Sequence, residues 1–314
     1  ALGNENLNKA EKARIKAEVI HIPHFSLPNQ PMDTDKNIAE LLKMTRVDKA
    51  KKIGLVGWKL FTSKIENNQF MYDIPHYIVS ALQGIVSAKF TNATYMFIGE
   101  NGVRTVNNAN EFAHYEFGAA LAGNCILNAI REIKEGVSEM EVASKLEMYG
   151  QRNSVVTIMS SGPRFVNANM YPGSNKIEKG DPISLTVGYK GGLQSRCGFA
   201  INDERELPKG QEDYLEAVVK PYFNAVKTWL ENIHVGMKGG ELYDLIEKVL
   251  PKEKYGWSLC PGHLCADEEW LSSPIYANSN EVIRSGMLFQ IDIIPSVKGY
   301  NGISCESGIF IANE

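Results

Sequence analysis

The sequence lacks an excess of positive charge and any long apolar run. Its 314 residues include 33 Lys and Arg against 37 Asp and Glu, a formal net charge of −4. That balance, without a run of Lys or Arg, argues against nucleic-acid binding through a basic surface. The longest apolar stretches, such as 287–295, have the length of a strand and are too short to cross a membrane. We therefore expect no nucleic-acid partner and no membrane partner.

Cysteines are also few, and no basic segment followed by an apolar one opens the chain, so no signal peptide is predicted. The thiols are odd in number and irregularly spaced, at Cys125, Cys197, Cys260, Cys265 and Cys305. This pattern is typical of reduced thiols in the cytoplasm rather than of a disulfide framework. The segment 260–265 carries Cys and His but lacks the paired spacing of a structural zinc site, so packing is its expected role.

Glycine-rich phosphate loops are missing as well. The stretch 188–192 has no following Lys-Ser or Lys-Thr pair, which excludes such a loop. Gly191 and Gly192 instead predict a hairpin turn between two strands.

The first hundred residues alternate short strand-like and helix-like segments, which predicts an α/β region. Residues 53–56 and 93–98 are apolar runs bounded by glycine, as in buried strands. Asp35 and Asp73 stand where helix caps are expected, so each predicts a helix that follows it.

A polar cluster at 107–110 marks a change in the sequence. It is followed by a long helical pattern over 111–134 and by a capping-box sequence that begins at Ser138. We therefore divide the chain into two domains, residues 1–108 and residues 109–314.

The second domain contains an internal repeat. Residues 133–141 recur in similar form as 233–241, at an offset of 100 residues. Each copy follows a long amphipathic helix, the second over about 211–231. Each also precedes a strand that a glycine opens, Gly180 in the first copy and Gly286 in the second. The pattern predicts a duplicated helix–helix–strand unit.

Five short motifs of the second domain are distinctive: Ser161–Pro163, Glu178–Asp181, Pro261–His263, Ser285–Phe289 and Ile303–Ile311. Through them the domain resembles a known family, the pita-bread proteins that include methionine aminopeptidase, prolidase, aminopeptidase P and creatinase. The prolidase and creatinase branch is the most similar one. The expected fold is therefore α+β, with a duplicated pita-bread domain after a smaller α/β creatinase-type domain that lacks its first strands.

The resemblance also implies a metal site. Peptidases of this family hold two divalent metals with two Asp, one His and two Glu. The corresponding positions, at intervals of 11, 66, 29 and 14 residues, are Thr186, Cys197, His263, Asp292 and Glu306. Only two of these residues are carboxylates, and no Asp or Glu occurs from 182 through 202 to replace the missing ones.

Two dications close together need more anionic charge than this set provides. The resemblance therefore implies a degraded dimetal site with no cofactor. A single divalent metal, Zn or Mn, on Cys197, His263, Asp292 and Glu306 is the alternative.

Two further histidines of the family, which assist the substrate, correspond to Asn169 and Trp270. Asn169 can orient a ligand but cannot exchange a proton. Tyr171 and Trp270 either line a ligand cavity or fill it. His263 and Glu306 form a candidate acid–base pair if they meet across the cavity.

These observations predict a member of the Xaa-Pro peptidase and creatinase family that is inactive as an ordinary dimetal aminopeptidase. One alternative is a hydrolase of a small peptide or amide C–N bond that uses one metal or none. The other is a binding module for a peptide, a metabolite or a protein. The resemblance further implies a homodimer.

Overall fold

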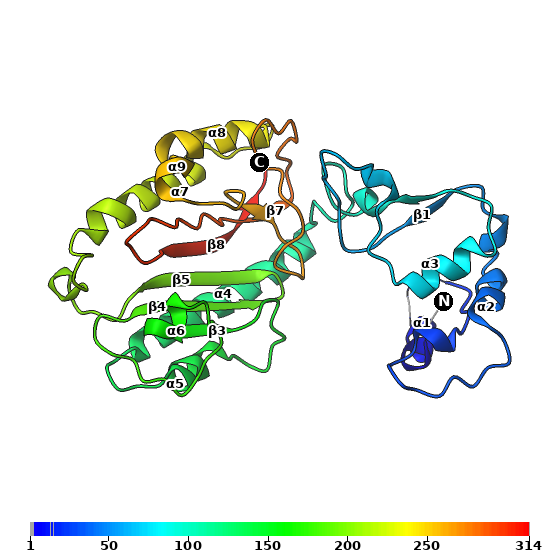
Figure 1. Cartoon of the computed structure of the whole chain (residues 1–314), viewed down its shortest axis with the longest axis horizontal. Helices are drawn as coiled ribbons and strands as arrows, with labels where there is room; N and C mark the ends of the chain where they lie inside the picture. The colour runs from blue at the N-terminus through cyan, green and yellow to red at the C-terminus, as the bar shows by residue number, and fades with distance from the viewer. Residues whose placement is uncertain (1–2, 13, 15, 314) are drawn as a thin grey trace. The chain divides into compact units, whose positions relative to one another are not determined.

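The computed structural model describes residues 3–12, 14 and 16–313. The chain forms two compact units, which divide between Met96 and Phe97 (Figure 1). Residues 97–108 thus pack with the second unit, although the sequence predicts a domain boundary at residue 108. That residue 108 separates two functional domains stays a prediction.

The first unit combines short helices with a small parallel sheet. Strands β1 (Ile53–Leu55) and β2 (Phe90–Asn92) pair in parallel. The helices are α1 (Leu7–Glu11), α2 (Ile38–Met44) and α3 (His76–Gln83). The core of this unit contains the buried residues Ile22, Leu41, Leu42, Leu55, Leu82 and Phe90.

The strand predicted at 53–56 is confirmed as β1, but the strand predicted at 93–98 is wrong. Residues Thr94–Met96 form a 3-10 turn, and β2 ends just before it. The physical reason is the side chain of Asn92, which accepts a hydrogen bond from the Thr94 backbone N at 2.8 Å and turns the chain.

Both predicted aspartate caps are also wrong. The Asp73 carboxylate accepts hydrogen bonds from the backbone N of Trp58 and of Lys59, at 2.8 and 2.9 Å, so it closes a loop instead of a helix. Asn37 rather than Asp35 caps α2, because its side chain accepts the third helical N–H.

The second unit contains one six-stranded antiparallel sheet in the order β3-β4-β5-β8-β7-β6. The strands are β3 (Ile158–Ser161), β4 (Pro182–Tyr189), β5 (Gly192–Phe199), β6 (His263–Leu264), β7 (Met287–Gln290) and β8 (Ser304–Ile311). The helices are α4 (Ala109–Glu132), α5 (Glu139–Ala143), α6 (Gly162–Val166), α7 (Lys220–Asn232), α8 (Gly239–Val249) and α9 (Lys252–Tyr255).

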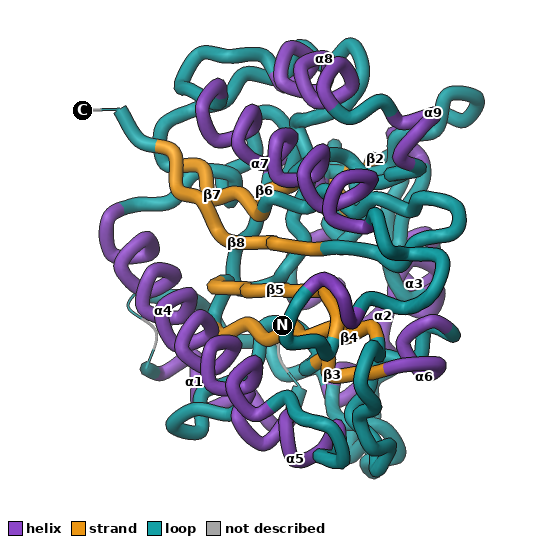
Figure 2. Tube along the Cα trace, turned by 90° about the vertical axis from the view of Figure 1, so that its left-hand side faces the viewer, coloured by secondary structure: helices purple, strands orange, loops and turns teal. Residues whose placement is uncertain are grey.

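The two long helices cover the two halves of this sheet. Helix α4 packs against β4 and β5, where Cys125 and Ile126 meet the strand residues Leu185 and Val187. Helix α7 belongs to the other half, where the Trp229 ring contacts a ring of β7 edge to face. Figure 2 shows α4 beside β4 and β5, and α7 beside β6 and β7.

The predicted repeat is confirmed in the backbone. Gly136 and Gly236 both adopt positive φ angles, +83° and +94°. Their backbone N–H groups donate to Ile177 and Ile283, in each case at 2.8 Å. The two copies therefore place the same turn and the same hydrogen bond in the two halves of the sheet.

Several local predictions for this unit also hold. The capping box at Ser138 begins α5, and the hairpin turn at Gly191 joins β4 to β5. The second long helix is shorter than its pattern suggests, because residues Leu215–Val219 form a π-helical turn before α7.

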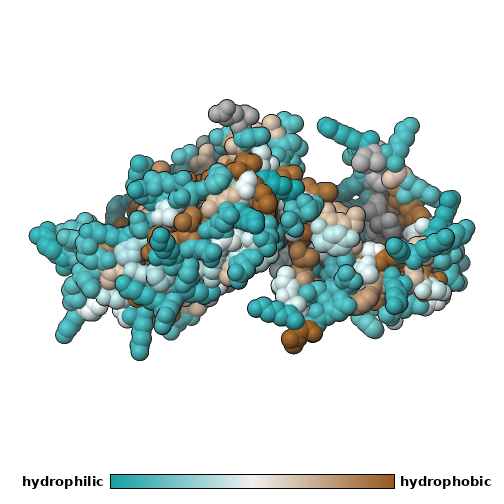
Figure 3. Space-filling view, turned by 90° about the horizontal axis from the view of Figure 1, so that it is seen from above, coloured by the Kyte–Doolittle hydropathy of each residue, from teal (hydrophilic) through white to brown (hydrophobic). Residues whose placement is uncertain are grey.

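Hydrophilic residues cover most of the surface seen in Figure 3. Within residues 3–12, 14 and 16–313, no helix has both the length and the apolar character that a membrane span requires.

Candidate functional site

Four of the five residues at the expected metal-ligand positions lie on or beside the central strands β4, β5, β7 and β8 (Figure 1). Thr186 on β4 pairs with Ser195 on β5, and Ser195 pairs with Glu306 on β8. Because side chains alternate along a strand, residues in one such row point to the same face of the sheet. The strand register therefore brings Thr186 and Glu306 to one face, with Ser195 between them.

A chain of hydroxyl groups joins this row. The Thr186 and Ser195 hydroxyl oxygens lie 2.8 Å apart. The Ser304 hydroxyl lies 3.3 Å from that of Ser195 and 2.8 Å from Oε1 of Glu306. All four residues are buried. Thr186, the residue at the first aspartate position, is thus satisfied by neutral neighbours.

Cys197 stands at the second aspartate position, in the neighbouring row of the sheet. It pairs with Ser184 on β4 and with Ser304 on β8. Its thiol donates to the Ser184 hydroxyl at 3.4 Å. Burial raises the pKa of the Cys197 thiol to about 11, so the sulfur carries no charge at neutral pH.

His263 and Asp292 approach each other at the other end of the site. His263 Nε2 and Asp292 Oδ2 are 3.7 Å apart, which is longer than a hydrogen bond. Burial lowers the pKa of His263 to about 4. Burial, and then the charges of Glu306 and Glu269, raise the pKa of Asp292 to about 8. At pH 7 both side chains are therefore predominantly uncharged, which agrees with the absence of a close ion pair.

Gln290 contributes a second kind of polar group to this region. It is fully buried on β7, opposite His263 in the strand register and two residues before Asp292. Neither atom of its side-chain amide makes a hydrogen bond of normal geometry among the described residues, and neither does Asp292 Oδ1. The amide nevertheless lies near enough to the Glu306 carboxyl to lower the pKa of that group. Unpaired buried polar atoms cost stability, so they are expected where a ligand supplies the missing partners.

Trp270 lies against the site, and the other two predicted ligand-contacting residues are held by a different set of contacts. The Trp270 and His263 rings stack with centroids 4.1 Å apart. Asn169 and Tyr171 are exposed, and both interact with Arg164, which donates to Asn169 Oδ1 at 3.4 Å and to the Tyr171 backbone O at 2.7 Å. Among the described contacts, Trp270 therefore packs against His263, whereas Asn169 and Tyr171 do not contact it.

Glu139 anchors helix α6, which carries Arg164. This carboxylate is fully buried and accepts hydrogen bonds from Arg164 Nε at 2.9 Å and from the backbone N of Ser161 and Gly173 at 2.8 and 2.9 Å. In contrast to Asp292, it is saturated by the protein itself. Glu139 thus has a structural role that the sequence alone did not reveal.

Four polar residues that surround the predicted ones were not predicted from the sequence, although their spacing from the ligand motif could have indicated them. Each lies two positions before a residue predicted from the ligand motif, so strand periodicity puts both on one face of the sheet. These residues are Ser184, Ser195, Gln290 and Ser304.

The chemistry of these groups does not fit two divalent metals. The first two ligand positions offer a hydroxyl bonded to Ser195 and a protonated thiol bonded to Ser184. Within the described residues, no three His, Cys, Asp or Glu side chains are grouped so that they could hold a metal ion. The remaining carboxylates, Asp292 and Glu306, cannot balance two dications.

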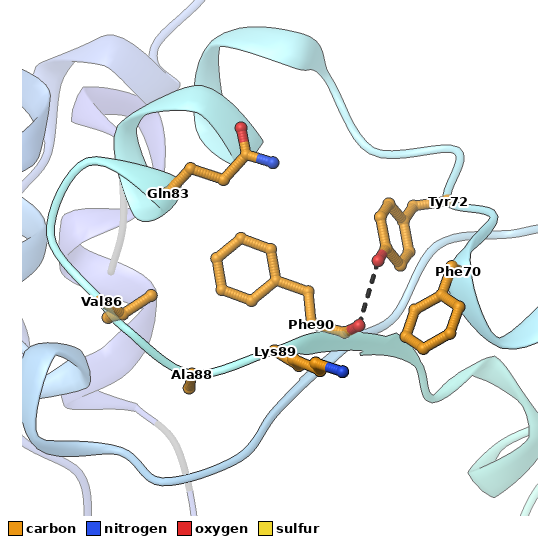
Figure 4. Close-up of a pocket in the computed structure, with 7 residues that line it drawn as sticks. All are labelled: Phe70, Tyr72, Gln83, Val86, Ala88, Lys89 and Phe90. Atoms are coloured by element: carbon orange, nitrogen blue, oxygen red, sulfur yellow. Dashed lines mark hydrogen bonds between the residues drawn. The ribbon is translucent and has the colours of Figure 1, made fainter.

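The first unit has a pocket of its own with a volume of about 360 Å³. Figure 4 shows its aromatic walls, made by Phe70, Tyr72 and Phe90, with Gln83 and Lys89 nearby. The Tyr72 hydroxyl donates to the Phe90 backbone O at 3.0 Å. This hydrogen bond satisfies a polar atom of the wall, and Gln83 and Lys89 add polar groups, so the pocket offers both apolar and polar surface.

Comparison with known proteins identifies the second unit. The family model described as metallopeptidase family M24 matches residues 113–313. The uncharacterized peptidase YqhT of Bacillus subtilis is 24% identical over 237 residues, which are 72% of this chain and 65% of that protein. An Xaa-Pro dipeptidase of Pyrococcus horikoshii is 25% identical over 67% of this chain and 60% of its own length. The chain thus spans slightly less than two thirds of these curated relatives.

Solved structures show the same fold. An Xaa-Pro dipeptidase from Bacillus anthracis superposes with a TM-score of 0.74 at 20% identity, over 99% of this chain and 81% of the other. The prolidase from Pyrococcus furiosus gives 0.68 at 21% identity, over 88% and 77%. The expected pita-bread architecture is confirmed.

Proposed function

The chain belongs to metallopeptidase family M24, and we propose that it binds a small peptide or amide ligand without acting as a dimetal peptidase. One observation carries this proposal. The side chains of Thr186 and Cys197 are neutral and are hydrogen-bonded to other hydroxyl groups. A site with this chemistry lacks the charge that holds two dications and activates a water molecule between them.

The unpaired polar atoms support an amide or peptide as the ligand. A buried Gln290 presents one donor group and one acceptor atom without partners, and Asp292 Oδ1 is a further unpaired atom. A peptide group also carries one donor and one acceptor, so it can satisfy the Gln290 amide in both directions. Trp270, stacked on His263, would supply an aromatic wall beside the ligand.

A second candidate is a hydrolase of a small amide that works without two metals. The approach of His263 Nε2 to Asp292 Oδ2 at 3.7 Å favours it, because a neutral imidazole accepts a proton and a protonated carboxyl donates one. Glu306, predicted as the partner of His263, lies on the same face of the sheet and already accepts from Ser304. A single Zn or Mn ion would require Cys197 to lose its proton.

The central experiment measures metal content and turnover on the same protein. After incubation with Mn²⁺, Co²⁺ or Zn²⁺ and removal of free ions, elemental analysis is expected to find less than one ion per chain. Hydrolysis of glycyl-proline should not exceed the rate of a matched blank. Two bound ions with metal-dependent turnover would overturn the proposal.

Glu306→Gln separates the two candidates. A hydrolase that uses this carboxyl should lose its turnover, whereas a binding protein should retain most of its affinity for the peptide. Glu116→Gln, on the exposed surface of α4, is the matched control for the loss of one carboxylate. Measured affinity for glycyl-proline and measured turnover together decide between the two candidates.

We also infer a reducing, cytoplasmic location, which the five free thiols support. The homodimer implied by the resemblance remains a prediction, and sedimentation measurements would test it.

A further inference from the structure

A pocket of the M24 unit has a volume of about 390 Å³, and all the residues that line it are polar or charged. Four separate segments form it: His114 on α4, the loop 152–154, Lys190 in the β4–β5 turn, and residues 267–268 after β6. None of the residues of the candidate site lines it. The pockets of the first unit differ, because aromatic rings form much of their walls.

Close backbone approaches at glycine hold these segments together. A Cβ at Gly191 would lie 2.1 Å from the Ala266 backbone O, and one at Gly192 would lie 2.0 Å from the Ala119 backbone N. The β4–β5 turn therefore packs directly onto both α4 and the loop after β6. A side chain at either glycine would push the walls of the pocket apart.

Hydrogen bonds fix two of the walls. Arg104 donates to Glu268 at 2.6 Å, an ion pair that holds the loop after β6. The Ser154 backbone N donates to the Gly188 backbone O at 2.9 Å, which holds the loop 152–154 against β4. The pocket is therefore formed before any ligand binds.

Three charged side chains in the pocket have no ionic partner. In the part of the chain that the structure describes, no oppositely charged side chain lies within 4.0 Å of Arg152, Lys190 or Asp267. The Ser154 hydroxyl oxygen is buried and has no hydrogen-bond partner there either. Two free cations, one free carboxylate and one unpaired hydroxyl thus line a single polar cavity.

We propose that this pocket binds a small zwitterion of the α-amino acid class. Arg152 and Lys190 would bind its carboxylate, and Asp267 would bind its ammonium group. A simple anion satisfies the two cations but meets repulsion from Asp267, and a simple cation meets the reverse. Only a ligand with both charges pairs all three side chains.

Isothermal titration calorimetry with three probes tests the charge requirement. L-serine carries both charges, whereas sodium acetate and methylammonium chloride each carry one. We expect L-serine to bind about tenfold more tightly than either single-charge probe. Equal affinity for acetate and L-serine, or no detectable heat with L-serine, would overturn the proposal.

Substitutions in the pocket assign the binding to it. Lys190→Met and Arg152→Met should each weaken L-serine binding by about tenfold. Lys209→Met removes an exposed lysine outside the pocket and should leave the affinity unchanged. If the pocket variants and this control bind alike, L-serine binds elsewhere and the assignment is wrong.

Asp267→Asn gives the sharpest test, because it should change the order of the probes. Without the carboxylate, L-serine loses a partner while acetate loses a repulsive charge, so the affinity for acetate should rise as that for L-serine falls. Asp244→Asn, on an exposed part of α8, is the control. Parallel loss of both probes would contradict the proposed arrangement of charges.

Asp292→Asn, in the candidate site, should leave L-serine binding intact. L-serine binding by this variant therefore tests the pocket separately from the function proposed for the candidate site.

Discussion

The Thr186 hydroxyl lies 2.8 Å from the Ser195 hydroxyl in the interior of the sheet. This contact satisfies both groups without any charge, at a position where the family's peptidases carry an aspartate.

Introducing carboxylates at the ligand positions that lack them should make the melting temperature of the protein depend on metal. Thr186 is 5% exposed, so an aspartate there would be an unpaired buried charge, and Thr186→Asp should lower the free energy of unfolding by about 3 kcal/mol. The triple variant Thr186→Asp, Cys197→Asp, Asp292→Glu should be unstable without metal and should melt at a higher temperature when Mn²⁺ is added.

Thr186→Val is the control for this series. It keeps the shape of the side chain and leaves the Ser195 hydroxyl with one partner fewer, at an expected cost of about 1 kcal/mol. Its melting temperature should not respond to Mn²⁺. A rise for the wild-type protein as large as that of the triple variant would contradict the prediction.

Gln290→Met should stabilise the protein and abolish ligand binding. The substitution removes a fully buried amide whose atoms have no partners, so the free energy of unfolding should rise by about 1 kcal/mol. Urea unfolding measures the gain, and titration with glycyl-proline measures the loss of affinity.

Gln194→Met is the matched comparison. Its side-chain oxygen accepts from Arg196 Nη2 and from the Ser307 hydroxyl, each at 3.0 Å, so the same substitution should destabilise the protein. Equal effects of the two substitutions would show that Gln290 is satisfied in solution.

Stability should fall as the pH rises from about 6.5 to 8. The pKa of Asp292 is raised to about 8, so the stability linked to its proton is complete below the unfolded pKa and is lost as the pH rises through 8. The pKa of His263 is lowered to about 4, so its contribution increases with pH up to about 6.5 and opposes that of Asp292 below that point. Above pH 6.5 the contribution of His263 is complete. The raised pKa of Asp292, and with it that of the neighbouring Glu306, then makes stability fall as the pH rises, by at most about 1.4 kcal/mol per pH unit for each carboxyl.

The free energy of unfolding in urea at several pH values checks this prediction. Asp292→Asn removes the titrating group and should flatten the curve between pH 6.5 and 8. If the variant and the wild-type protein show the same slope there, the loss of stability belongs to other groups.

Glu139 should be among the most important polar residues for stability. Its fully buried carboxylate satisfies Arg164 and two backbone N–H groups, so Glu139→Ala should cost about 3 kcal/mol or more. Glu141→Ala removes an exposed carboxylate from the same helix, which accepts from the Ser138 backbone N in the capping box, and should cost much less stability than Glu139→Ala. Chemical unfolding of the two variants, compared with the wild-type protein, measures the difference.

Local sequence patterns predicted much of the fold because short-range chemistry controls it. The repeat at an offset of 100 residues reappears as equivalent turns at Gly136 and Gly236, since both need a positive φ angle. The same reasoning failed at Asp73, whose carboxylate reaches a loop distant in sequence. Rules based on neighbouring residues cannot predict a contact of this kind.

The sequence by itself determined which residues stand at the five ligand positions, and therefore how little negative charge they hold. Only the tertiary structure decided what replaces that charge. The strand register places Ser195 between Thr186 and Glu306, and it places Gln290 opposite His263. These partners come from strands far apart in the chain, and the hydrogen bonds and unpaired atoms that define the site exist only once the sheet has formed.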